Sequence, residues 1–133
     1  MRFFLTIHFC FFLSFFSFSQ GLMDPKNSTT RQDTLRGSIT AERSWWDLNY
    51  YHLDISVNPE KKYIEGSNLV YYTVLNSNNV LQIDLQEPLE LLMAKQEGEK
   101  LEIQKEGNAY FITLKKDQIL GSLEKIKLFY KGN

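Results

Sequence analysis

Residues 51–59 read YHLDISVNP, and this stretch decides the fold class. Leu53, Ile55 and Val57 alternate with polar residues, which is the period of a half-buried β-strand. The Asn-Pro pair that follows indicates a turn, because proline fixes φ and asparagine favours turn geometry. The stretch therefore predicts a strand that ends in a tight connection.

The same pattern continues toward the C-terminus. Further strands are expected over 63–75, 80–85, 89–95, 101–105, 110–114 and 126–130. Gly66 predicts a bulge or a close approach of two backbones. Leu92 breaks strict alternation, so a helical turn at 89–93 is the one alternative to a strand. Short strands separated by frequent turns predict an all-β fold, an antiparallel β-sandwich or an open barrel.

The N-terminal part of the chain has a different composition. Residues 20–42 are polar and show neither a strand period nor a helical one, which predicts a flexible polar leader. The β-sandwich domain is therefore expected over residues 43–133.

Residues 1–19 have the three parts of a secretory signal peptide. Arg2 is their only charge, the apolar run 3–16 follows, and Ser17 and Ser19 give a small-residue exit before Gln20. A spanning helix needs about 20 apolar residues, and this run is shorter. The sequence therefore predicts a cleaved signal, no stable membrane anchor, and a periplasmic or extracellular location.

The net charge and the number of metal-binding side chains exclude some classes of function. The formal net charge of −1 gives no basic footprint, so nucleic acid is not an expected partner. Signal cleavage would remove Cys10 and His8 and leave His52 as the only histidine. Zinc sites in proteins are built mainly from several His and Cys ligands. We therefore predict no catalytic, cofactor-binding or metal-binding residue in this chain.

Two weaker chemical candidates have competing interpretations. His52 and Asp54 share the polar face of one strand, as a base held by a carboxylate or as two solvent-facing residues. The second interpretation is favoured because no nucleophile or metal partner accompanies them. The many carboxylates between Glu60 and Glu106 alternate with lysines, which is typical of a solvated surface rather than a glycosidase pair.

An aromatic group precedes the first strand. Trp45, Trp46, Tyr50 and Tyr51 could form a platform for a sugar or a peptide, could anchor the core, or could dock the domain on another domain. The sequence favours packing, and it leaves the other two roles open.

The order of these motifs resembles the N-terminal domain of zinc aminopeptidases of the aminopeptidase N type. The similarity runs through RSWWD at 43–47, YHLDISVNP at 51–59, KKYIEGS at 61–67, LQIDL at 81–85 and YKG at 130–132. It implies a saddle-like β-sandwich that packs on a thermolysin-like catalytic domain. In the family that second domain carries the zinc, the HExxH helix and the G-x-M-E-N loop, and neither motif occurs in this chain.

The resemblance implies a function for the whole family and a narrower one for this chain. We expect the non-catalytic N-terminal domain of an exported zinc aminopeptidase, inactive alone, incomplete at its C-terminus, and partnered by the catalytic domain. The alternative is a stand-alone exported β-sandwich module that binds peptide or glycan. A domain that docks on a partner is expected to expose an apolar patch when it is alone.

Overall fold

A computed structural model describes residues 29–133, and the predicted signal peptide lies outside them. Two short helices precede eight strands: α1 (Arg31–Gly37), α2 (Ala41–Ser44), β1 (Trp46–Asn58), β2 (Tyr63–Val74), β3 (Val80–Asp84), β4 (Glu90–Gln96), β5 (Glu99–Lys100), β6 (Glu102–Glu106), β7 (Ala109–Thr113) and β8 (Leu123–Gly132). No helix among the described residues is long and apolar enough to cross a membrane. The predicted all-β fold is confirmed.

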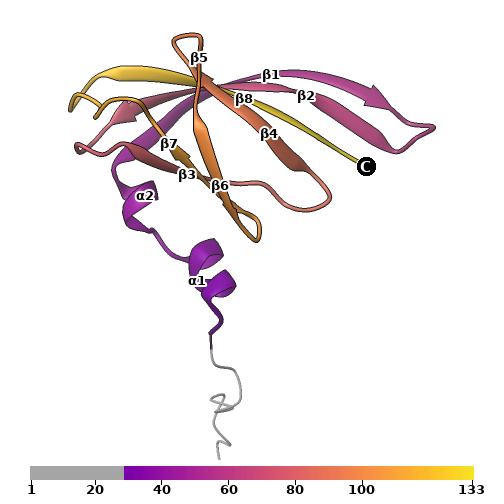
Figure 1. The fold of residues 1–133 in the computed structure, drawn as a ribbon, viewed down its shortest axis with the longest axis horizontal. Helices are drawn as coiled ribbons and strands as arrows, with labels where there is room; N and C mark the ends of the chain where they lie inside the picture. The colour runs from indigo at the N-terminus through magenta and orange to yellow at the C-terminus, as the bar shows by residue number, and fades with distance from the viewer. Residues whose placement is uncertain (1–28) are drawn as a thin grey trace, which may run out of the picture.

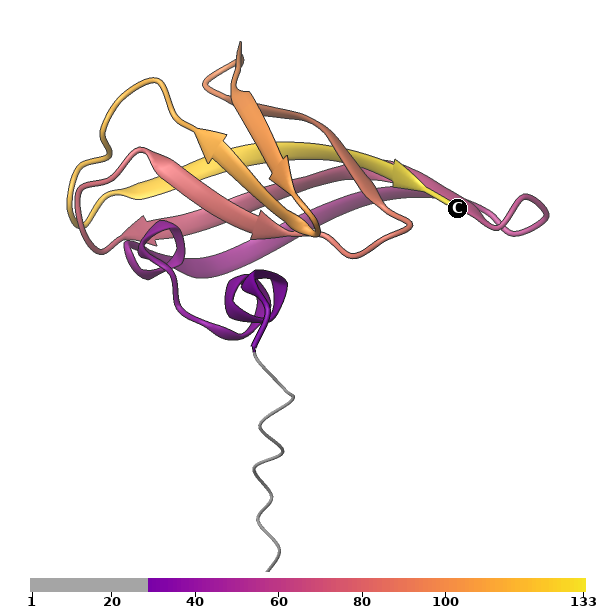
Figure 2. The ribbon, with the colours of Figure 1, turned by 60° about the horizontal axis from the view of Figure 1, so that its bottom comes forward.

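The strands form two antiparallel sheets. The larger has the order β1-β2-β8-β4-β5, and the smaller has the order β3-β7-β6. Figure 1 shows the smaller sheet lying against one face of the larger one. In Figures 1 and 2 the β1–β2 hairpin runs beyond the smaller sheet, so part of the larger sheet has no second layer.

The core lies where the two sheets overlap. Val70 and Tyr72 on β2, Ile126 on β8 and Ile112 on β7 are completely buried. Trp45 packs edge to face on Tyr72, with ring centroids 5.9 Å apart. Burial raises the pKa of Tyr72, because the phenolate would lose its hydration. This inward-facing set confirms the alternation predicted for the second strand.

The first strand differs from its prediction in burial. β1 is a strand as predicted, but Leu53, Ile55 and Val57 are 55%, 43% and 62% exposed. The expected half-burial is wrong because β1 is an edge strand and extends past the smaller sheet. Alternation marks the face that is apolar, and a neighbouring layer decides whether that face is covered.

Two local irregularities in the sequence have structural counterparts. At Gly66 a side chain would collide with the backbone of Asp54 and Ile55, so the predicted close approach is confirmed, and the pairing there is regular. Near Leu92 the β4–β8 register shifts between Leu91 and Met93. The alternative of a helical turn at 89–93 is therefore wrong, because a β-bulge turns Leu92 outward while Leu91 stays buried.

The segment 29–42, predicted as part of a flexible leader, contains regular structure. Thr30 and Asp33 form a capping box at the start of α1, with the Thr30 amide donating to the Asp33 carboxylate at 2.9 Å. Leu35 on α1 is buried. A helix of seven residues is too short to show a period in the sequence, so tertiary contacts decide its structure.

Candidate functional site

A row of apolar side chains on β1 lies at the surface of the described residues. We call Tyr51, Leu53, Ile55 and Val57 the β1 strip; each is between 43% and 62% exposed. In the β1–β2 register Tyr51 lies opposite the buried Val70, so the strip continues the core face of the sheet. Contiguous exposed apolar side chains often mark interaction surfaces.

A cavity lies where the strip meets the core. It has a volume of about 220 Å³, and its lining includes Tyr51, Asn68, Leu85, Leu91 and Tyr130 from both sheets. Partial burial raises the pKa of Tyr51 and Tyr130. Asn68 Oδ1 is buried and has no hydrogen-bond partner among the described residues. Sequence analysis missed Asn68, although its position in line with Val70 predicts an inward direction.

The aromatic group divides between two roles. The Trp45 indole N–H donates to the Val80 carbonyl at 2.6 Å, and the Trp46 indole N–H donates to the Glu42 carbonyl at 3.1 Å. Both rings pack edge to face on Tyr72, which confirms the packing interpretation for the tryptophans. Tyr50, by contrast, is 56% exposed. The tryptophans therefore anchor the entry to β1, and the tyrosines remain available for contacts.

His52 and Asp54 lie on the polar face of β1, as the alternation predicts, and both are exposed. The structure gives neither side chain a hydrogen-bond partner among residues 29–133, and no group of three or more metal-binding side chains occurs there. A zinc ion of the kind that the resemblance places in a catalytic domain therefore does not fit the residues described in this chain.

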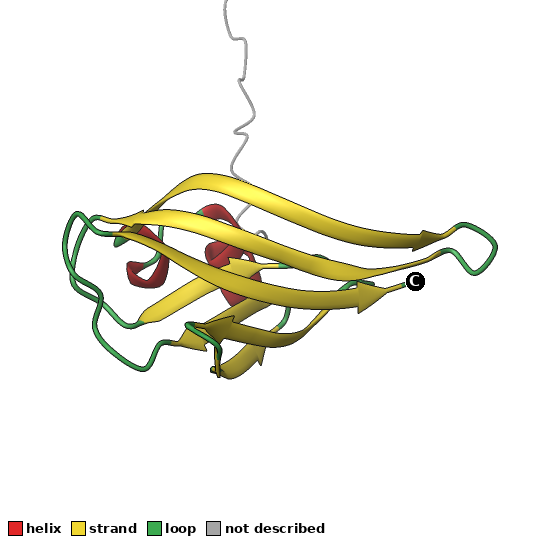
Figure 3. Cartoon of the chain, turned by 90° about the horizontal axis from the view of Figure 1, so that it is seen from above, coloured by secondary structure: helices red, strands yellow, loops and turns green. Residues whose placement is uncertain are grey.

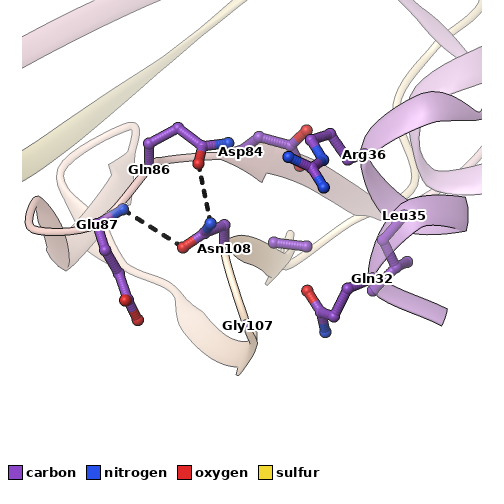
Figure 4. Close-up of a pocket in the computed structure, with 9 residues that line it drawn as sticks. Gln32, Leu35, Arg36, Asp84, Gln86, Glu87, Gly107 and Asn108 are labelled. Carbon is purple, nitrogen blue, oxygen red and sulfur yellow. Dashed lines mark hydrogen bonds between the residues drawn. The ribbon is translucent and has the colours of Figure 1, made fainter. Parts of the chain in front are cut away.

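The outer face of the smaller sheet carries a second cavity, of about 260 Å³, beside α1 (Figure 4). The Asn108 amide donates to the Gln86 side chain at 3.0 Å, and the Glu87 amide N–H donates to Asn108 Oδ1 at 3.4 Å. Asp84 is paired with Arg43, which precedes β1. The hydrogen bonds drawn in Figure 4 join two loops beside α1, and the residues drawn there include no nucleophile with an adjacent base.

A second ion pair joins α1 to the smaller sheet. The Arg31 guanidinium donates to the Glu106 carboxylate at 2.9 Å and holds the pKa of that carboxyl below its usual range. Gln82, which is buried, donates to the Leu35 carbonyl at 3.3 Å. These contacts fasten α1 to the smaller sheet.

Comparison with known proteins gives structural neighbours only. No family model and no curated protein matches the sequence. An M1 zinc metallopeptidase from Deinococcus radiodurans is similar over 68% of this chain, with a TM-score of 0.61 and 18% identity. A leukotriene A4 hydrolase from Saccharomyces cerevisiae is similar over 66% of the chain, with a TM-score of 0.54 and 20% identity.

The similarity covers only a small part of each of these two enzymes. The chain spans 21% of the length of the Deinococcus enzyme and 15% of the yeast enzyme. At these identities the likeness establishes the fold. The resemblance seen in the sequence is thus confirmed at that level: the chain has an all-β fold that also occurs in aminopeptidase-type M1 zinc metallopeptidases.

Proposed function

We propose that this chain is a non-catalytic β-domain of an exported zinc aminopeptidase and that it packs on a thermolysin-like catalytic domain through the β1 strip. The observation that carries the proposal is the β1 strip. Its side chains lie on the core face of the larger sheet, at the part of β1 that extends beyond the smaller sheet. The fold likeness to M1 zinc metallopeptidases supports the choice of partner.

The energetics favour burial of the strip. Burying an aliphatic or aromatic side chain completely stabilises by about 1.5–3 kcal/mol. The four side chains of the strip are roughly half exposed, so covering them would contribute several kcal/mol to docking. A cavity with an unpartnered acceptor, Asn68 Oδ1, lies at the inner end of the strip. A partner that offers an apolar side chain with a hydrogen-bond donor would fill and satisfy it.

In this proposal the partner domain, and not this chain, supplies the zinc ligands for peptide hydrolysis. The described residues offer His52 without a second imidazole, a thiol or an organised carboxylate set. Peptide hydrolysis by zinc needs three protein ligands and an open position on the metal. The purified chain is therefore expected to turn over no aminoacyl substrate, with or without a chelator.

The experiment that tests docking is co-expression. The chain is produced together with the HExxH-containing polypeptide encoded in the DNA beside its gene, and the complex is purified through a tag on the chain. We expect a complex that Ile55→Asp abolishes. Ser56→Asp is the matched control, since it places the same charge one residue away on the opposite face. Loss of the complex with both variants, or with neither, would contradict docking through the strip, as would absence of any such reading frame.

A further inference from the structure

The four sheet edges of the described chain are protected very unequally. β5 has two residues, and β6 has five, of which Glu102, Lys105 and Glu106 are charged. β3 is bordered by α2 and fixed by the Trp45–Val80 hydrogen bond. Short length, charge and a covering element are the usual ways in which proteins block edge pairing.

β1 has little of this protection, with Asp47 and Asp54 as the acidic residues among its thirteen. It is an edge strand of thirteen residues, and it contains no proline and no lysine. Its register with β2 is regular from Tyr51 to Asn58, after an irregularity near Leu48. Figure 3 shows β1 as the outermost strand of the larger sheet, with no described element beyond its free edge. The outward backbone groups of this strand are a template for another strand.

The sequence of β1 is self-complementary in one antiparallel register. We propose that two copies of this chain pair through their β1 edges, with Leu53 opposite Leu53 on a two-fold axis perpendicular to the sheet. In that register Tyr51 lies opposite Ile55 of the second copy, so the apolar strips merge on one face. On the other face His52 lies opposite Asp54 of the second copy, twice.

Neighbouring registers lack this match. Centring the pair on Asp54 sets two carboxylates against each other, which is unfavourable for directly opposed residues. Centring it on Ile55 leaves His52 and Asp54 without a charged counterpart. A shift by one residue in the pairing would bring apolar side chains of one copy opposite polar ones of the other. Two-fold symmetry and the His52–Asp54 spacing therefore select the register centred on Leu53.

This inference uses the edge of β1, whereas the proposed function uses its face, so the two can fail separately. The first test is sedimentation of the full chain with Cys10→Ser. We expect a dimer whose dissociation constant rises about tenfold with His52→Asp, because two pairs that can hydrogen-bond become pairs of opposed carboxylates. The double variant His52→Asp, Asp54→His exchanges the two side chains and is expected to restore the dimer.

The second test is cross-linking in the same background. Leu53→Cys is expected to give a disulfide-linked dimer on oxidation, since the two thiols face each other on the axis. Leu92→Cys, at a leucine of β4 that is 47% exposed against 55% for Leu53, is the control and is expected to stay monomeric. A monomer at all concentrations, no rescue by the double variant, or equal cross-linking at both positions would overturn the proposal. A monomeric chain that still binds a catalytic partner would overturn only this inference.

Discussion

β1 and β2 are neighbouring strands with the same apolar alternation and opposite burial. Val70, Tyr72 and Val74 on β2 are at most 1% exposed, whereas Leu53, Ile55 and Val57 on β1 are at least 43% exposed. Their backbones pair along the whole length of the hairpin. The difference teaches that one pattern can serve two purposes, closing the domain's own core and offering a surface to something else.

The largest test of this comparison is a pair of truncations. Ile126→Ala on β8 removes a fully buried side chain, and we expect it to lower the free energy of unfolding by about 2–5 kcal/mol. Leu53→Ala removes a side chain that is 55% exposed, and we expect a loss of about 1 kcal/mol or less. Urea denaturation of the two variants measures both. Equal losses would show that the strip packs within the isolated domain.

A second variant tests how β1 is held. Gly66→Ala would push a methyl group into the backbone of β1 at Asp54 and Ile55, and we expect a loss of about 1–3 kcal/mol. Faster hydrogen exchange at the amides of the β1–β2 hairpin should accompany it, with the smaller sheet unchanged. Gly37→Ala is the control, because a Cβ there meets open space. If both variants unfold alike, backbone proximity is not what secures β1.

The smallest expected effect concerns α1, which is attached to the smaller sheet by polar groups. The folded-state pKa values of Glu106 and Asp33 lie below their ordinary values of 4.5 and 3.8, mainly through hydrogen bonds from Arg31 and Thr30. Their stabilising contribution is therefore present above those values and is lost as the pH falls through the folded ones. We expect the NMR signals of α1 to lose dispersion below about pH 4.5 while Ile112 stays protected. Glu106→Gln should remove part of this dependence, and a pH-independent α1 would refute it.

The sequence predicts most of the sheet structure, because alternation and turn residues are local signals. The strands expected over 101–105 and 110–114 form as the antiparallel pair β6 and β7, with Glu106 opposite Ala109. The sequence pattern does not predict α1 and α2, since helices of seven and four residues make too few turns to show a period. The Thr30–Asp33 capping pair was the one local signal for α1.

The sequence predicts which residue types lie on the apolar face of β1, but it does not predict whether they are exposed or buried. The strand pattern identifies the apolar face of β1, but its exposure depends on where the smaller sheet ends. The importance of Asn68 depends on burial, which no local pattern reveals. The placement of His52 and Asp54 on one exposed face of β1 follows directly from the two-residue period of the strand.

β8 is the last strand along the described chain, yet it is the middle strand of the larger sheet, between β2 and β4. Until residues 123–132 leave the ribosome, the hairpin and the rest of that sheet have no strand to join them. Synthesis therefore delivers this connecting strand after every other strand of the larger sheet, and closure of the sheet waits for contacts between distant parts of the chain. Such an order of assembly leaves the β1–β2 hairpin and β4 unpaired with each other until β8 has been made.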